Sequence, residues 1–141
     1  MPFDPALAAP DAARQRFDAL ILERTGTPFA WGRHDCCLWA ADCVRAITGT
    51  DPAADVRGTY ADAAGAAAVL AGIGGIEAAG ARAGEPIAPM FATWGDVGLA
   101  VDDGRNTLAV CAGAGWLAPA ADGLALLPFN AAMKAWRVAR G

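Results

Sequence analysis

The first half of the chain carries apolar residues at the spacing of α-helices. Residues 9–26 predict a first helix with Asp11 as its N-cap and one apolar face. Residues 35–50 predict a second helix, for which Asp35 is a suitable N-cap. In this second helix the side chain of Asp42 is expected to point outward.

A third helical segment, rich in alanine, follows. It is expected to begin at about Thr59 or Tyr60 and to stop near residues 72–75, with a short helical turn over residues 76–84. The first 85 residues or so are therefore predicted to be helical, apart from the loops between these segments.

From about residue 93 the pattern changes to short strands separated by turns. Two strands are expected around the turn at Asp103-Gly104 and two more around Asp122-Gly123. Residues 132–139 would form a last strand, with alternate side chains on opposite faces. Helices followed by an antiparallel β-meander predict an α+β fold. We expect one domain over residues 1–141, with its helical part at about 1–85 and its sheet part at about 93–140.

Composition and charge narrow the functional classes. The chain has 141 residues, a hydrophobic fraction of 55% and a formal net charge of -4, with no cluster of Lys and Arg. A nucleic-acid-binding surface is not expected, because such surfaces concentrate positive charge. No secretory signal and no membrane span are expected, because the uncharged runs are short and interrupted by Gly and Pro. We therefore expect a protein that folds in the cytoplasm with its four cysteines reduced.

The residues with chemical potential gather in the segment FAWGRHDCCLWAAD, residues 29–42. If Asp35 caps the second helix, Cys36 lies in the first turn, where unpaired N–H groups and the helix dipole favour a thiolate. A thiolate is the nucleophile of cysteine catalysis, which also needs a base. His34, the one histidine of the chain, is a weak candidate for that base. The alternative is a loop histidine that is bonded locally or exposed.

The other cysteines predict no metal or redox site. Cys37, Cys43 and Cys111 are expected to behave as small buried apolar residues. Adjacent cysteines do not match the C-x₂₋₄-C spacing of structural zinc sites, and C-x-x-C redox motifs are absent from the sequence. Neither a metal nor a cofactor is expected.

Two motifs resemble the NlpC/P60 family, papain-like cysteine peptidases that act on cell-wall peptides. That family has an aromatic-x-Trp-Gly segment and then Asp-Cys-Ser-Gly-Leu, whose cysteine is the nucleophile. This chain has FAWG at residues 29–32 and DCCL at residues 35–38, followed later by a strand TLAVCAG at residues 107–113 that matches the family's second strand. The resemblance implies a papain-like fold with Cys36 as the equivalent of the nucleophile.

One departure from that family concerns its base. Thr107 stands where the family's strand carries its catalytic histidine, and Cys37-Leu38 replaces Ser-Gly. A threonine hydroxyl cannot accept a proton from a thiol near neutral pH. The resemblance therefore implies a poor amidase even if Cys36 is activated.

Over most of its length the chain is similar to phage and prophage proteins of the DUF6950 family. It carries that family's four signature segments, at residues 31–42, 51–60, 95–97 and 135–138. The resemblance suggests a gene context among phage tail modules. It implies a location in the host cytoplasm during assembly, and in a virion or tail particle afterwards.

Three hypotheses follow. In the first, a catalytically impaired NlpC/P60-like protein acts in tail assembly or structure, with other phage tail proteins as partners. In the second, the chain is a cysteine peptidase or amidase acting on peptidoglycan peptide, with Cys36 as nucleophile and His34 or a partner's group as base. In the third, the likeness is architectural and the role is unrelated.

Overall fold

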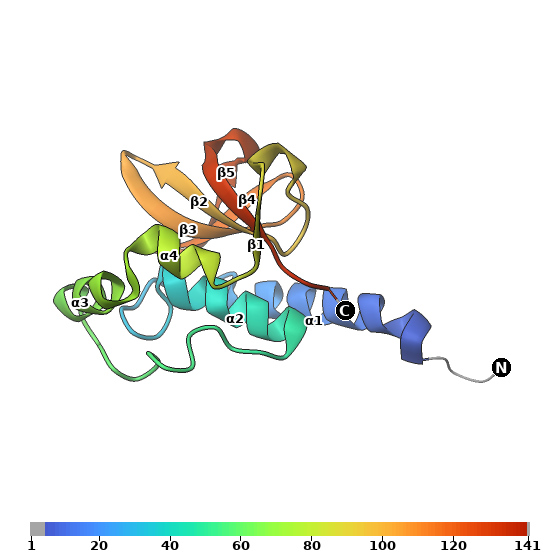
Figure 1. The fold of residues 1–141 in the computed structure, drawn as a ribbon, viewed down its shortest axis with the longest axis horizontal. Helices are drawn as coiled ribbons and strands as arrows, with labels where there is room; N and C mark the ends of the chain where they lie inside the picture. The colour runs from blue at the N-terminus through green and yellow to red at the C-terminus, as the bar shows by residue number, and fades with distance from the viewer. Residues whose placement is uncertain (1–4, 141) are drawn as a thin grey trace.

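The helices of the protein lie on one side of its β-sheet (Figure 1). The computed structural model describes residues 5–140, with side chains from residue 12 onward. The helices are α1 (Pro5–Arg24), α2 (Cys36–Thr48), α3 (Ala63–Ile73) and α4 (Ile76–Ala81). Two short 3-10 segments, η1 (Pro89–Phe91) and η2 (Phe129–Ala131), occur within the C-terminal half.

The sheet has six antiparallel strands, so the expected α+β order of helices before sheet is confirmed. Its spatial order is β1-β6-β2-β3-β4-β5. The strands are β1 (Glu85–Ile87), β2 (Val97–Asp102), β3 (Arg105–Cys111), β4 (Gly115–Ala120), β5 (Gly123–Pro128) and β6 (Ala132–Arg137).

This order corrects the expected meander. Strands β2 to β5 do follow one another as neighbours, but β6 returns to pair with β2 and also with β1, a strand that the sequence pattern did not predict. The short β1 supplies edge hydrogen bonds and has no buried residue. It therefore lacks the apolar alternation by which strands are recognised.

Two tight turns set the register of the meander. Asp103 and Gly104 both have positive φ, 50° and 75°, as a type I′ turn between β2 and β3 requires. The second turn lies one residue earlier than predicted, at residues 121–122, because Gly123 already begins β5. A Cβ on Gly123 would lie 2.1 Å from the Thr25 carbonyl oxygen, so this glycine lets β5 approach the end of α1.

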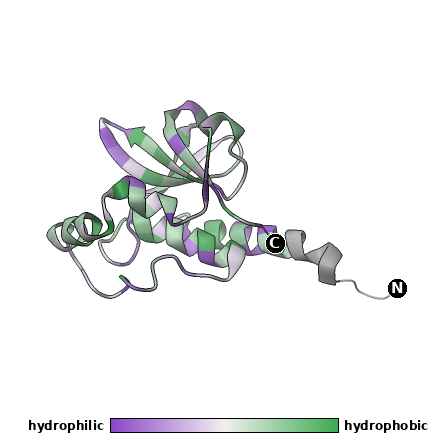
Figure 2. Cartoon of the chain, in the orientation of Figure 1, coloured by the Kyte–Doolittle hydropathy of each residue, from purple (hydrophilic) through white to green (hydrophobic). Residues whose placement is uncertain are grey.

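The main core lies between the helices and the sheet. Hydrophobic positions occur in both layers (Figure 2). Phe17 of α1, together with Trp39 and Cys43 of α2, is fully buried against the sheet. The indole Nε1 of Trp39 donates to the Leu117 carbonyl of β4 at 2.9 Å, which satisfies its one polar group. Because Phe17 of α1 is buried in this core, the apolar face predicted for the first helix is confirmed.

A second core lies on the opposite face of the sheet. Its centre is Trp116, whose ring would contact a Cβ on Gly98 at 2.5 Å. Every strand contributes a side chain to this cluster. The contributing strand residues are Ile87, Ala100, Ala109, Cys111, Trp116, Ala118, Leu127, Ala132 and Ala135.

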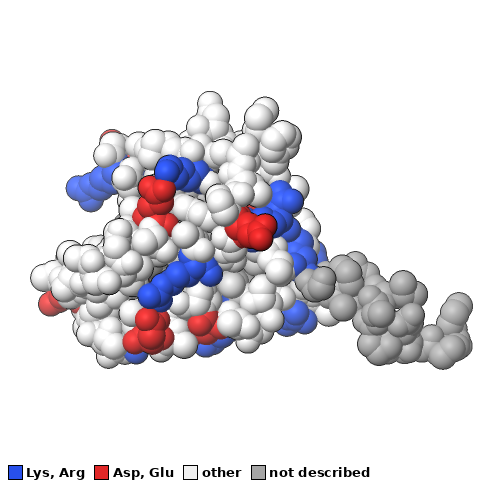
Figure 3. Space-filling model, viewed as in Figure 1, with Lys and Arg blue, Asp and Glu red and all other residues white. Residues whose placement is uncertain are grey.

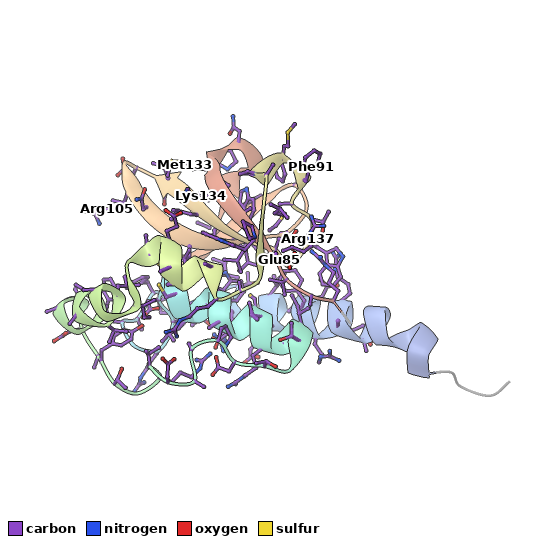
Figure 4. All side chains as sticks on the ribbon, viewed as in Figure 1. Glu85, Phe91, Arg105, Met133, Lys134 and Arg137 are labelled. Atoms are coloured by element: carbon purple, nitrogen blue, oxygen red, sulfur yellow. The ribbon has the colours of Figure 1, made fainter. Side chains whose placement is uncertain are left out.

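Hydrophobic residues also occur on the outside of the sheet region. Phe91 of η1 points away from the body, and Met133 of β6 is 53% exposed (Figure 4). Lys134 of β6 pairs with Glu77 of α4, which joins the sheet to the helical layer on its outer side. On the face seen in Figure 3, positive and negative side chains are interspersed and most of the surface is uncharged.

Three sequence expectations about the helices are corrected or refined. Helix α1 begins at Pro5, so Asp11 lies inside it and is not its N-cap. Asp42 points inward and is only 8% exposed, because Arg24 and Arg57 both bind its carboxylate. Helix α3 begins at residue 63 rather than 59 or 60, after the N-cap Asp62.

Candidate functional site

The start of α2 is held by the buried carboxylate of Asp35. Its Oδ1 accepts from the Leu38 amide at 2.9 Å, as an N-cap should. Its Oδ2 accepts from the Gly32 amide at 3.1 Å and from the Tyr60 hydroxyl at 2.5 Å. Asp35 therefore fixes the helix start, the preceding turn and the segment around Tyr60 relative to one another.

Gly32 is needed for this arrangement. Its φ is +76°, and a Cβ there would lie 2.2 Å from the Tyr60 carbonyl oxygen. The Trp-Gly and Asp-Cys pieces of the sequence motif thus serve one local structure. Gly32 lets the Tyr60 backbone pack directly against the turn, and Asp35 binds both the Gly32 amide and the Tyr60 hydroxyl.

Cys36 occupies the first position of α2 and is half-buried. Its Sγ lies 4.0 Å from the Sγ of Cys37, whose thiol can donate to it. The pKa of Cys36 is lowered to about 7, mainly by the hydrogen bond from Cys37 and less by the Leu108 amide and the Thr107 hydroxyl, against the opposing effect of burial. The same interaction raises the pKa of Cys37, so of the two thiols Cys36 is the one that ionises.

The structure brings Thr107 to Cys36. Thr107 lies on β3 opposite Ala100 of β2, and its hydroxyl is near enough to the Cys36 sulfur to lower the pKa of that thiol. Its Oγ1 also lies 3.2 Å from the Leu108 carbonyl oxygen, an alternative acceptor for the same hydroxyl proton. The strand position that matches the histidine of the resembled family therefore has a hydroxyl near the helix-terminal sulfur in place of an imidazole.

His34 lies elsewhere. It is 3% exposed, its Nδ1 is 3.3 Å from a guanidinium nitrogen of Arg24, and its ring packs edge-on against Trp39. Burial, followed by the positive charge of Arg24, lowers the pKa of His34, so the ring is neutral at neutral pH. Within the described part of the chain it makes no hydrogen bond with Cys36. The arrangement matches the alternative of a locally bonded histidine, although a buried one.

Sequence reasoning missed the partners that fix His34. With Nδ1 accepting from Arg24, the ring carries its proton on Nε2, which is buried and has no hydrogen-bond partner among the residues that the structure describes. Arg24 also binds Asp42 at 2.8 Å, so one guanidinium joins α1, the histidine and α2. No sequence spacing signals such a contact, because Arg24 lies at the end of one helix and Asp42 in the middle of the next.

Trp94 and Asp96, which precede β2, serve the packing of the C-terminus. Asp96 is fully buried and accepts from the Thr93 amide at 2.9 Å and the Val138 amide at 3.0 Å. The guanidinium carbon of Arg140 lies over the ring of Trp94, 4.8 Å from the ring centroid. Asp96 therefore satisfies backbone N–H groups before the start of β2 and after the end of β6.

A cavity of about 190 Å³ opens beside Cys36. Its walls come from α2, the segment 52–60, α3, α4 and the paired strands β2 and β3. Among its lining residues are Trp31, Cys36, Cys37, Ala40, Val44, Val56, Tyr60, Val69, Leu70, Ile73, Arg82 and Leu108. The walls are mostly aliphatic, so the space beside the sulfur suits an apolar group.

Side chains that could bind a metal ion are scattered over the described part of the structure. Among the residues that the structure describes, no three His, Cys, Asp or Glu side chains lie close enough together to hold an ion. Nor is any helix in the described part long and apolar enough to cross a bilayer.

Comparison with known proteins places most of the chain in a family. The model of the family described as "Domain of unknown function (DUF6950)" matches residues 10–138. Searches of curated proteins and of solved structures give no significant match. The match covers both the helical part and the sheet, including the cysteine at the start of α2.

Proposed function

This chain belongs to the DUF6950 family, and from that premise we propose that it is a phage or prophage tail-associated protein with an NlpC/P60-like fold. In this proposal it lacks the base of a cysteine peptidase and acts in tail assembly or tail structure. Its partners are other tail proteins.

One observation carries the catalytic part of this proposal. The pKa of Cys36 is lowered by the Cys37 thiol, the Leu108 amide and the Thr107 hydroxyl, while the one imidazole of the chain is buried against Arg24 and Trp39. A thiolate can attack an amide, but the leaving amine must then receive a proton. A general acid–base group is worth roughly 10² to 10⁴ in rate, and no imidazole stands at the sulfur to supply it.

The arrangement of elements supports the NlpC/P60-like part. A cysteine at the N-terminus of a buried helix faces a strand of an antiparallel sheet that follows the helices in sequence. The resembled family uses the same order, with its histidine on the strand that corresponds to β3. The tail association rests on the likeness to phage and prophage proteins.

A cleavage assay tests the catalytic part. Purified muropeptides are incubated with the wild-type protein, with Cys36→Ser and with Thr107→His, and the products are measured by mass spectrometry. We expect the wild type to release no more product than Cys36→Ser, and Thr107→His to gain a Cys36-dependent activity. Cleavage by the wild type that Cys36→Ser abolishes would contradict the proposal.

Complementation tests the tail role. A phage or prophage lacking this gene is supplied in trans with the wild type or with Cys36→Ala, and tails are counted by electron microscopy. We expect both proteins to restore tails equally, since assembly does not need the thiol. Normal tails without the gene, or restoration by the wild type alone, would contradict it.

One observation favours a second function, a cysteine peptidase or amidase that acts on peptidoglycan peptides. The pKa of Cys36 is lowered to about 7, so a substantial part of this thiol is ionised at neutral pH without a base. A partner protein would then supply the missing acid–base group. Repeating the cleavage assay with purified tail particles, with and without Cys36→Ser, tests this reading.

A further inference from the structure

The cavity beside Cys36 is elongated along α2. Residues Cys36, Ala40 and Val44 all line it, and they follow one another at intervals of four along one face of the helix. At a rise of 1.5 Å per residue, this face extends over about 12 Å. A compact apolar cavity of about 150 Å³ accepts a benzene ring. A volume of about 190 Å³ spread along two turns of helix suits an extended chain better than a ring.

The two ends of the cavity differ in charge. The segment 52–60 forms one wall. At one end of this segment Tyr60 binds Asp35, and at the other the Pro52 carbonyl accepts from Arg82. The carboxylate of Asp35 is buried and already accepts from three donors. Arg82 is the one cation among the lining residues that the structure describes, and its ion pair with Asp55 is exposed.

We propose that this cavity binds an unbranched aliphatic monocarboxylate, with its hydrocarbon chain along α2 and its carboxylate at Arg82. Exposed ion pairs contribute little, so a carboxylate can replace Asp55 at the guanidinium at small cost. Burial of the methylene groups supplies most of the affinity. The inference goes beyond the proposed function and does not depend on it, since it needs neither a reactive Cys36 nor a tail.

Helix α3 forms the outer wall and would respond to the ligand. Of its residues only Ala66 is buried in the described structure, while Val69, Leu70 and Ile73 are half-buried and line the cavity. A hydrocarbon chain in the cavity would give these three side chains the apolar contacts they lack. Amide exchange in α3 should therefore slow when the ligand is bound.

A chain-length series tests the proposal. Straight-chain carboxylates from butanoate to hexadecanoate are titrated into the full-length protein by calorimetry. We expect each added methylene to tighten binding about fourfold until the cavity is full, after which affinity levels off. Affinity that does not depend on chain length, or no binding at any length, overturns the proposal.

Two variants with matched controls test the placement. Val69→Phe fills the cavity and should abolish binding, whereas Val101→Phe, at an exposed position of β2, should not. Arg82→Gln should weaken carboxylates about threefold to tenfold and leave alcohols of the same length unchanged, whereas Arg105→Gln should change neither. Equal binding by Val69→Phe and the wild type, with both folded by circular dichroism, overturns the proposal.

The wild type alone provides a further check. Because Cys36 lines the cavity, a bound carboxylate should slow its alkylation by iodoacetamide. Protection by a saturating carboxylate supports the proposal even if Val69→Phe fails to fold, and unchanged alkylation overturns it. Vesicles of phosphatidylglycerol distinguish a free acid from a membrane lipid: retention on vesicles without binding of free acids overturns the small-molecule assignment.

Discussion

At the residue scale, the reactivity of Cys36 depends on its neighbour in the helix. The thiol of Cys37 is the largest cause of the lowered pKa of Cys36, ahead of the Leu108 amide and the Thr107 hydroxyl, while burial and Asp35 act in the opposite direction. A second sulfur thus takes part of the role that an imidazolium has in other cysteine sites. It stabilises the thiolate, but it does not release its own proton at neutral pH, because its pKa is raised.

This dependence can be measured through alkylation. In the wild type, the rate of iodoacetamide reaction at Cys36 should rise with pH around an inflection at about 7. Cys37→Ala removes the donor, so the inflection should move upward toward the ordinary value of 9.0. Cys37→Ser keeps a hydroxyl donor and should leave it low. Tandem mass spectrometry assigns the modified sulfur, and an unchanged inflection in Cys37→Ala would show that the pair does not interact.

The identity of the candidate nucleophile could be predicted from sequence, but its surroundings could not. An aspartate before a helix predicts both the N-cap and the first-turn position of Cys36, and both are observed. Burial of His34 against Arg24 depends on how α1 crosses α2, which has no local sequence signal. The cavity also arises from packing, because its walls come from segments far apart in the chain.

At the element scale, the caps of α2 and α3 have the same chemistry in different surroundings. Asp35 and Asp62 each accept from the amide three residues later. Asp62 is exposed and has that one role, whereas Asp35 is buried and also accepts from Gly32 and Tyr60. A comparison of the stability lost on removing each aspartate therefore measures what the contacts of Asp35 with Gly32 and Tyr60 contribute.

Substitution by alanine should separate these contributions. Asp62→Ala removes one exposed cap and should lower the free energy of unfolding by about 1 kcal/mol. Asp35→Ala also leaves the Gly32 amide and the Tyr60 hydroxyl without an acceptor, so the loss should reach about 3 kcal/mol. Urea denaturation followed by circular dichroism gives both values. Similar losses in the two variants would mean that the Tyr60 contact adds no stability.

Strand order was harder to predict than strand existence. The turn at Asp103-Gly104 identifies β2 and β3 because only a few residues tolerate positive φ at both positions. The pairing of β6 with β2, rather than with its sequence neighbour β5, joins strands far apart in the chain, and no local sequence signal indicates it. In the observed order, β6 buries Trp136 against the helices and Ala135 in the second core. The alternation of side chains along β6 would allow the same burial beside β2 or beside β5, so it could not decide between them.

At the scale of the whole molecule, a partly buried network of ion pairs holds the helical layer together. The Asp42 carboxylate binds Arg24 of α1 at 2.8 Å and Arg57 of the loop before α3 at 2.6 Å. Arg57 also binds Asp51, which lowers the pKa of that carboxyl. This explains why Asp42 faces inward: the position joins three segments, and the two guanidinium groups offset the cost of burying its charge.

Removing Asp42 should therefore affect the molecule as a whole. Asp42→Asn leaves two arginines facing a neutral amide, and because both guanidinium groups are partly exposed we expect a loss of about 2 kcal/mol, below that of a fully buried pair. Asp18→Asn breaks the exposed i,i+4 pair with Arg14 and should cost about 0.5 kcal/mol or less. Thermal and urea unfolding measure both, and proteolysis within residues 51–60 should accelerate in Asp42→Asn alone, because Arg57 would lose one of its two anchors. A loss in Asp42→Asn no greater than that in Asp18→Asn would show that packing, and not this network, holds α1 and the loop to α2.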